Sequence, residues 1–215
     1  MAGPAKVERV AVAHDGPAFV VRADPEVAPR LAFLPGVCSN AYAYLLAFPE
    51  AARAHGGVVA IDGDRPCVGA PGFRSFSWDA KVQDARISQA IQAASPGALP
   101  GPVTLVGYSA GAGIGEQMAE RWPERYRRLV LIGAPSDPSV RRLAQAEGVV
   151  TMSCARDVPG RMKSAAQRLR AAGVPATYIE MPGCTHGMLG EAEARLGEAF
   201  RWLEANARKV PAPPR

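Results

Sequence analysis

Three side chains could together perform nucleophilic catalysis, and they occur in the order Ser109, Asp157, His186. A serine hydroxyl alone is a weak nucleophile. It becomes reactive when a histidine takes its proton and a carboxylate holds the imidazole in the correct tautomer. The order serine, acid, histidine is the one expected for a site built at the edge of a parallel sheet. These residues therefore predict a covalent, acyl-transferring hydrolase site.

The serine lies in the segment Gly-Tyr-Ser-Ala-Gly, residues 107–111, between a β-branched apolar run at 102–106 and a proline-free run at 112–121. The first run is typical of a buried strand and the second of a helix. Glycines two residues before and after Ser109 leave room for a strand and helix that pass very close. The pattern predicts a sharp turn that exposes the serine hydroxyl, although the five-residue motif also occurs by chance in ordinary loops.

Only three histidines are available as the base. His14 falls in the first predicted hairpin, and His55 ends a predicted helix, where a cation suits the helix dipole. His186 follows the last predicted strand, so it should lie at the carboxyl edge of the sheet, where ligands bind in open α/β folds. We expect His186 to be the base; the alternative is a structural histidine in a loop.

Two aspartates are candidates for the acid. Asp157 follows the predicted strand at 149–154, and Asp137 follows the one at 128–132. The 29 residues from Asp157 to His186 allow one helix and one strand, which would bring the two loops side by side. Asp137 has a simpler interpretation as a turn or N-cap residue before Pro138. We favour Asp157.

An oxyanion needs two backbone N–H groups aimed at the developing charge. One is expected from Ala110, directly after the serine and at a helix N-terminus. The other is expected from the loop after the strand at 30–34, with Val37 as first choice and Cys38 as second. Pro35-Gly36 in that loop would by itself indicate only a turn.

Substrate contacts are predicted for side chains that flank these positions, although each is equally compatible with simple packing: Cys38, Tyr108, Trp78 and Met188.

Strand-like and helix-like segments alternate along the chain, which predicts an α/β fold with a mostly parallel sheet. The chain should open with an antiparallel hairpin around Asp15-Gly16, and residues 65–77 should form an irregular surface loop. We expect strands at 7–13, 18–23, 30–34, 57–61, 102–106, 128–132, 149–154 and 177–181, and helices at 42–54, 79–94, 112–121, 140–146, 161–172 and 191–207.

The sharp turn at residues 107–111 has the pattern of a nucleophile elbow. With this elbow and the Asp157 and His186 loops identified, the chain resembles the α/β-hydrolases over nearly its whole length. Within them it is similar to small lidless carboxylesterases, including the polyhydroxybutyrate-depolymerase-like and dienelactone-hydrolase-like groups. The resemblance implies a mostly parallel eight-stranded sheet with helices on both faces. In those families the loop after the third strand usually reads His-Gly, whereas this chain has Pro35-Gly36, which weakens the assignment of Val37. The connection from Ile132 to Val149 is too short for a cap domain, so the site should be open.

The four cysteines all fall at or just after the ends of predicted strands: Cys38, Cys67, Cys154 and Cys184. In a sheet of this family, Cys38 and Cys67 would follow neighbouring strands, as would Cys154 and Cys184. Two disulfides are therefore conceivable, but without a visible signal peptide we favour free buried thiols. No cysteine or histidine spacing suggests zinc.

Composition limits the classes of function. The 215 residues are 48% apolar and 21% charged, and the net charge is +5. The chain is thus long enough for one globular domain over 1–215, with frayed tails at 1–6 and 208–215. Its arginines are scattered, which argues against nucleic acid as a partner. No apolar run is of transmembrane length, so we expect no membrane insertion.

The start of the chain, residues 1–8, lacks an apolar h-region, so a cytoplasmic location is expected, although a secreted parent without its leader would look the same.

The sequence therefore predicts a serine hydrolase acting on a small carboxylic ester or thioester without a cofactor. Hydrolysis of an amide or C–C bond is an alternative within the same fold. A non-catalytic binding module is an alternative of another class. The oligomeric state stays open.

Overall fold

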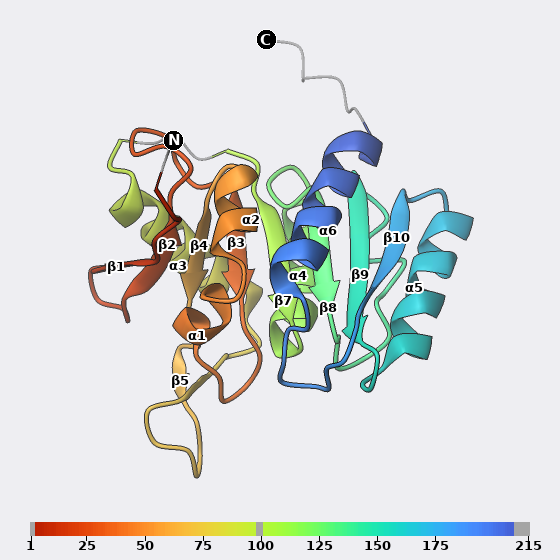
Figure 1. Ribbon diagram of the computed structural model, residues 1–215, viewed down its shortest axis with the longest axis horizontal. Coiled ribbons are helices and arrows are strands. Elements are labelled where there is room, and N and C mark those ends of the chain that lie inside the picture. Colours follow the sequence, from red (N-terminus) through yellow and green to blue (C-terminus); the bar gives the residue numbers. More distant parts are fainter. Residues whose placement is uncertain (1–2, 98–100, 209–215) are drawn as a thin grey trace.

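An eight-stranded sheet crosses the molecule in the computed structural model, which describes residues 3–97 and 101–208 (Figure 1). The strand order is β1-β2-β4-β3-β7-β8-β9-β10. The pairs β1–β2 and β2–β4 are antiparallel, and all others in this sheet are parallel. The strands are β1 (Glu8–Val10), β2 (Ala18–Val21), β3 (Leu31–Leu34), β4 (Val58–Ile61), β7 (Thr104–Tyr108), β8 (Arg128–Ile132), β9 (Gly148–Cys154) and β10 (Ala176–Met181). The predicted α/β class and N-terminal hairpin are confirmed.

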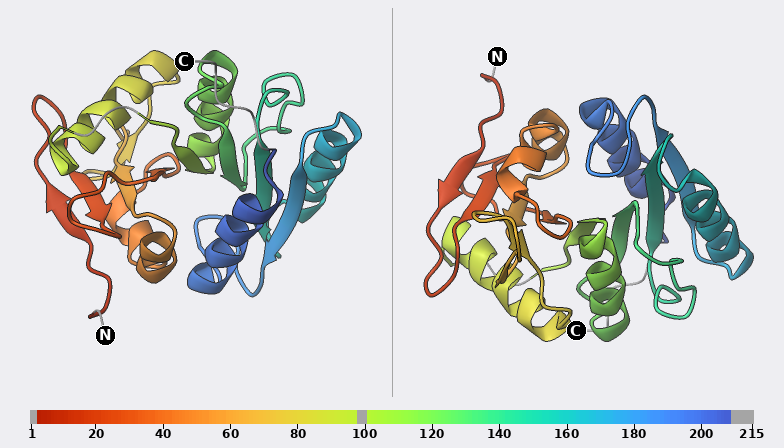
Figure 2. Two further views of the ribbon diagram at one scale, coloured as in Figure 1. Left: turned by 90° about the horizontal axis from the view of Figure 1, so that it is seen from above. Right: turned by 90° about the horizontal axis from the view of Figure 1, so that it is seen from below.

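Helices cover both faces of the sheet (Figure 2). One apolar cluster packs α3 (Ala80–Ala94), α4 (Ala110–Arg121) and α5 (Pro159–Ala171) against one face. A second cluster packs α1 (Ala41–Leu45), α2 (Pro49–Ala54) and α6 (Ala192–Asn206) against the other. Central strands such as β4, all of whose residues are buried, are therefore apolar on both faces and do not alternate.

Three local expectations were wrong. The helix expected at 42–54 is two helices, because Pro49 lacks an N–H and takes the first position of α2. The helix expected at 140–146 is a series of turns, closed by bonds such as Leu143 N–H to Ser139 O (3.1 Å). The loop expected at 65–77 contains a small antiparallel hairpin, β5 (Arg65–Pro66) and β6 (Arg74–Ser75).

Both cysteine pairs are disulfides: Cys38 with Cys67, and Cys154 with Cys184. The preference for free thiols was therefore wrong. Parallel neighbouring strands end at the same edge, so β9 and β10 place Cys154 and Cys184 with their Cα atoms 5.0 Å apart. That separation suits a disulfide.

The two expected frayed tails lie partly outside the described residues, namely at 1–2 and 209–215. Among the described ones, the Ala5 N–H donates to Glu50 (2.7 Å) and the Arg208 N–H donates to the Glu147 carbonyl (2.8 Å). None of the helices in the described ranges has the length and apolar character needed to cross a membrane.

Candidate active site

The turn between β7 and α4 holds Ser109 in a conformation that L-residues rarely adopt, with φ 51° and ψ −115°. A Cβ on Gly107 would lie 2.4 Å from the Gly111 carbonyl oxygen, and one on Gly111 would lie 2.0 Å from the Leu34 carbonyl oxygen. Neither space admits a side chain, so the two glycines permit the close packing that the motif predicts. The strained turn projects the serine beyond the end of β7.

Three loops at the carboxyl edge of the sheet bring the predicted nucleophile, base and acid together. Ser109 Oγ lies 3.1 Å from His186 Nε2, and His186 Nδ1 lies 2.8 Å from Asp157 Oδ2. Asp157 follows β9 and His186 follows β10, which are adjacent strands. In this geometry the Ser109 hydroxyl donates to Nε2 while Nδ1–H donates to the carboxylate.

The other candidates for acid and base lie elsewhere. Asp137 is largely exposed and pairs with Arg161 (3.5 Å) and Arg168 (3.3 Å). His14 lies in a turn with positive φ. His55 follows the last residue of α2 and contacts Glu204 (2.7 Å) through Nδ1.

The Cys154–Cys184 disulfide links the two loops that carry the acid and the base. Next to it, the Asp157 N–H donates to the Cys154 carbonyl (3.1 Å) and the Arg156 N–H to the Cys184 carbonyl (3.2 Å). These links fix the two loops relative to one another, which keeps Asp157 within hydrogen-bonding distance of His186.

Gly133, directly after β8, is a site residue that the sequence analysis missed. Its φ is +54°, and a Cβ there would lie 2.9 Å from Asp157 Oδ2 and 3.4 Å from the His186 ring. The glycine thus leaves room for the acid and base to meet. In the sequence, the one sign of this role was that Gly133 directly follows the strand at 128–132, which neighbours the strand that leads into Ser109.

Gly133→Ala should lower kcat on the order of 10²-fold, because the added methyl group pushes Asp157 away from His186. Gly173→Ala is the matched control: Gly173 also has positive φ (+79°), but open space surrounds its Cβ position. Both variants should lose about 1–2 kcal/mol of stability from backbone strain, and only the first should lose turnover. Equal kcat values, measured with stability by urea unfolding, would contradict this role.

The loop expected to supply the second oxyanion donor lies against the serine, since a Cβ on Gly36 would be 3.2 Å from Ser109 Cβ. Within the described ranges, the N–H groups of Ala110, Val37 and Cys38 have no hydrogen-bond acceptor. Unpaired donors beside the nucleophile are what a developing oxyanion requires. Ala110 also begins α4, whose dipole favours negative charge at that end.

Two tyrosines hold the loop that carries the base. The Tyr108 hydroxyl accepts from the Gly187 N–H, and the Tyr44 hydroxyl donates to the Gly187 carbonyl (2.9 Å). The Tyr108 and His186 rings lie 5.4 Å apart. Burial raises the pKa of Tyr108 to about 12, so its hydroxyl stays protonated. Together the two hydroxyls bind both backbone groups of the residue that follows the base.

The four side chains predicted to contact the substrate differ in how far they are exposed. Tyr108 is only 2% exposed and packs beneath the His186 loop, so the expectation that it lines a pocket is corrected. Cys38 is held in its disulfide with Cys67. Trp78 and Met188 are about half exposed, and the Trp78 ring lies against Gly113 of α4. The last two remain candidates.

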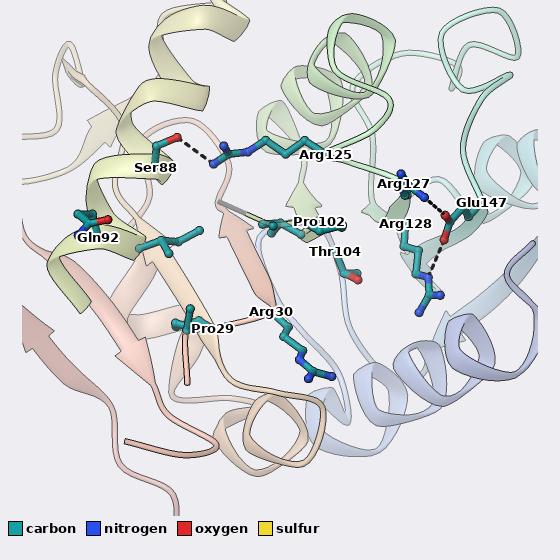
Figure 3. A pocket seen from close by; sticks show the side chains of 14 residues that line it. Pro29, Arg30, Ser88, Gln92, Pro102, Thr104, Arg125, Arg127, Arg128 and Glu147 are labelled. Carbon is teal, nitrogen blue, oxygen red and sulfur yellow. Dashed lines mark hydrogen bonds and ion pairs between the residues drawn. The ribbon is translucent and has the colours of Figure 1, made fainter. Parts of the chain in front are cut away.

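A hollow of about 550 Å³ opens at the opposite, amino-terminal edge of the sheet (Figure 3). Its polar lining is largely paired internally: Arg125 donates to Ser88 (2.8 Å), while Arg127 and Arg128 share Glu147. None of the three residues Ser109, Asp157 and His186 lines it. The hollow is therefore separate from the candidate active site.

A buried carboxylate, Glu116, lies in the helix that follows the nucleophile. Its Oε2 accepts from the Ser139 N–H (2.9 Å), and its Oε1 has no partner among the described residues. Burial raises the pKa of Glu116 to about 7, against the opposing effect of the Ser139 N–H and Arg142. Between pH 4.5, the ordinary pKa of a glutamate, and about pH 7, the native state therefore binds a proton that the unfolded state has already released.

Glu116→Gln should remove this pH dependence of stability. The raised pKa means that the stabilising contribution of protonated Glu116 is complete below its unfolded pKa and lost as the pH rises through about 7. The loss amounts to at most about 3 kcal/mol. Urea unfolding at about pH 5 and about pH 8.5 should show that the free energy of unfolding of the variant, relative to that of the wild type, is greater at the higher pH. A parallel pH profile for the two proteins would contradict the prediction.

Comparison with solved structures shows the same architecture in several hydrolases. Esterase PE8 matches with a TM-score of 0.65 at 19% identity over 87% of this chain and 97% of its own. FphF, a fluorophosphonate-binding serine hydrolase from Staphylococcus aureus, matches with 0.64 at 13% identity over 94% and 99%. Carboxyl esterase 2 from the fungus Tuber melanosporum matches with 0.64 at 14% over 94% and 87%.

This chain has the α/β-hydrolase fold. No protein-family model and no curated protein sequence matches it. The identities to the solved structures are low, so the likeness concerns the fold, and the α/β-hydrolase architecture accounts for the elbow after β7 and for the loops at the carboxyl edge.

Proposed function

We propose that this protein is a serine hydrolase that cleaves carboxylic esters or thioesters through an acyl-enzyme. The observation that carries the proposal is the chain of contacts from Ser109 Oγ to His186 Nε2 (3.1 Å) and from His186 Nδ1 to Asp157 Oδ2 (2.8 Å). The strained turn at Ser109 and the free N–H groups beside it support the same reaction. The solved structures of similar fold that are named esterases are consistent with it.

In the first half of the reaction, Ser109 Oγ attacks the carbonyl carbon while its proton passes to His186 Nε2. The carbonyl oxygen becomes an oxyanion, which accepts hydrogen bonds from the N–H groups of Ala110 and Val37. The intermediate then collapses, the bond to the leaving alcohol or thiol breaks, and His186 returns the proton to that leaving group. Asp157 holds the imidazole and stabilises its cation throughout.

In the second half, water attacks the acyl-enzyme and His186 takes its proton. Collapse of the second intermediate releases the carboxylic acid and returns the proton to Ser109. The turns between β8 and β9 are too short to form a cap over the serine, which leaves the site open to the ester substrate.

The test is hydrolysis of p-nitrophenyl esters from acetate to palmitate, together with labelling by a fluorophosphonate. We expect turnover and a single label on Ser109, located by mass spectrometry of the digested protein. A label without turnover on any ester would redirect the proposal to amide or C–C bonds. No label and no turnover would leave a binding module as the better reading.

The two disulfides favour an oxidising compartment over the cytoplasmic location expected from the sequence. Thiol titration of the denatured protein without reductant should find no reactive cysteine among the four. Four reactive thiols in protein isolated from its native host would contradict the disulfides and restore the cytoplasmic expectation.

A further inference from the structure

The hairpin of β5 and β6 projects beyond the sheet at the edge that carries Ser109 (Figure 1). It follows the carboxyl end of β4, and its tip spans residues 67–73. The tip is Cys-Val-Gly-Ala-Pro-Gly-Phe and carries no charge. Val68 is 100% exposed and Phe73 is about half exposed.

The hairpin is held in place by several links. The disulfide from Cys67 to Cys38 joins it to the loop that bears Val37. The Ser39 N–H donates to the Arg74 carbonyl (3.2 Å), which pairs the same two segments again. Within the tip, the Phe73 N–H donates to the Ala70 carbonyl (3.1 Å). The exposure of Val68 is therefore a property of a folded, cross-linked projection.

Other exposed apolar side chains surround the serine on this edge. Val37 lies in the loop packed against Ser109, Met188 follows the base by two residues, and the Trp78 ring lies on α4 one turn after the serine; each is about half exposed. Single exposed apolar residues need no explanation, but several gathered on the same edge of the sheet indicate an interaction surface.

The shape and charge of this surface select its partner. A protein partner would require an interface of about 1,000 Å² or more with close packing, which a narrow tip with two large apolar side chains does not offer. Binding at a lipid surface scales with the apolar area buried plus the attraction of cations to anionic lipids, so a small apolar tip with a cation beside it gives weak, reversible contact. Arg65 and Arg74 flank the tip at its base; Arg65 pairs with Asp64 (3.4 Å), whereas Arg74 is exposed and has no ion pair among the described residues. An exposed arginine beside an apolar tip is suited to contact lipid phosphates.

We infer that the tip at 67–73 enters the surface of a phospholipid layer, and that Ser109 acts on acyl esters presented at that surface. This inference rests on the proposed esterase function and names its substrate class: lipid esters gathered at an interface. It replaces the expectation of no membrane insertion by shallow contact of one hairpin, without any spanning segment.

The experiment measures binding separately from catalysis. Protein carrying Ser109→Ala is sedimented with vesicles of phosphatidylcholine containing phosphatidylglycerol, and with vesicles of phosphatidylcholine alone. Val68→Ser is compared with Val27→Ser, because Val27 is another exposed valine, located before the amino-terminal end of β3. A double variant, Val68→Ser with Phe73→Ser, extends the series. The same substitutions are also made in protein that retains Ser109, and hydrolysis of water-soluble p-nitrophenyl acetate by these variants shows whether the site is intact.

We expect binding to the mixed vesicles, weaker binding to phosphatidylcholine alone, and a loss of at least about tenfold in the double variant. Val27→Ser should bind like the parent, and all tip and control variants that retain Ser109 should hydrolyse the acetate equally. Absence of vesicle binding, or equal binding by the double variant, would overturn the inference while leaving acetate hydrolysis to support the proposed function. Vesicle binding without any acetate hydrolysis would remove the esterase step and overturn the inference as stated.

Discussion

Replacing Ser109 with alanine should lower kcat for p-nitrophenyl acetate on the order of 10⁶-fold and abolish labelling by a fluorophosphonate. The reason is that Ser109 Oγ forms the acyl-enzyme in the proposed mechanism, and it is the hydroxyl that His186 Nε2 contacts, at 3.1 Å. The oxyanion donors would remain, so a residual rate above that of water is expected. The measurement is the steady-state rate with protein verified as folded by circular dichroism.

Ser95→Ala is the matched control. Ser95 is also a buried serine, its Oγ has no partner among the described residues, and it follows the last residue of α3. That variant should keep the full rate and the full label. Turnover that survives in Ser109→Ala would place the nucleophile elsewhere and remove the proposed mechanism.

Asp157→Asn should lower kcat on the order of 10⁴-fold near neutral pH. Asn keeps the size of the side chain, but its amide can present an N–H to His186 Nδ1, 2.8 Å away in the native pair. The imidazole would then carry its proton on Nε2 and could not accept one from Ser109. KM should change little, because in the proposed mechanism Asp157 lies behind His186 and does not contact the substrate.

Asp137→Asn tests the other carboxylate that follows a neighbouring strand. Asp137 pairs with Arg161 and Arg168 at the surface, and an exposed ion pair contributes about 0–1 kcal/mol. Its replacement should leave kcat unchanged. A large loss in Asp137→Asn together with near-normal turnover in Asp157→Asn would reverse the assignment of the acid.

The sequence predicted what depends on neighbours along the chain. Glycines around Ser109 indicated the sharp turn because a side chain at either position would meet backbone within a few residues or on the adjacent strand. Apolar runs indicated the strands, and Asp15-Gly16 indicated the hairpin. The break at Pro49 was missed, although proline favours the first position of a new helix.

The candidate site was predicted in the same way, from topology. Residues that follow parallel strands collect at one edge, so Ser109, Asp157 and His186 could be named before their distances were known. The choice of Asp157 over Asp137 depends on which loop reaches His186, and the contact of 2.8 Å between His186 Nδ1 and Asp157 Oδ2 supports Asp157.

By itself, the sequence determined the alternating fold, the elbow and the residue types at the catalytic edge, because local sterics and strand order constrain them. Only the tertiary structure decided what depends on segments far apart in the chain. The two disulfides join residues separated by 29 and 30 positions, Tyr44 and Tyr108 meet at Gly187, and Gly133 makes room for the acid and base. The position of the projecting hairpin likewise depends on the disulfide from Cys67 to Cys38. The composition of the loop at 65–77 does not reveal which distant residue holds it in place.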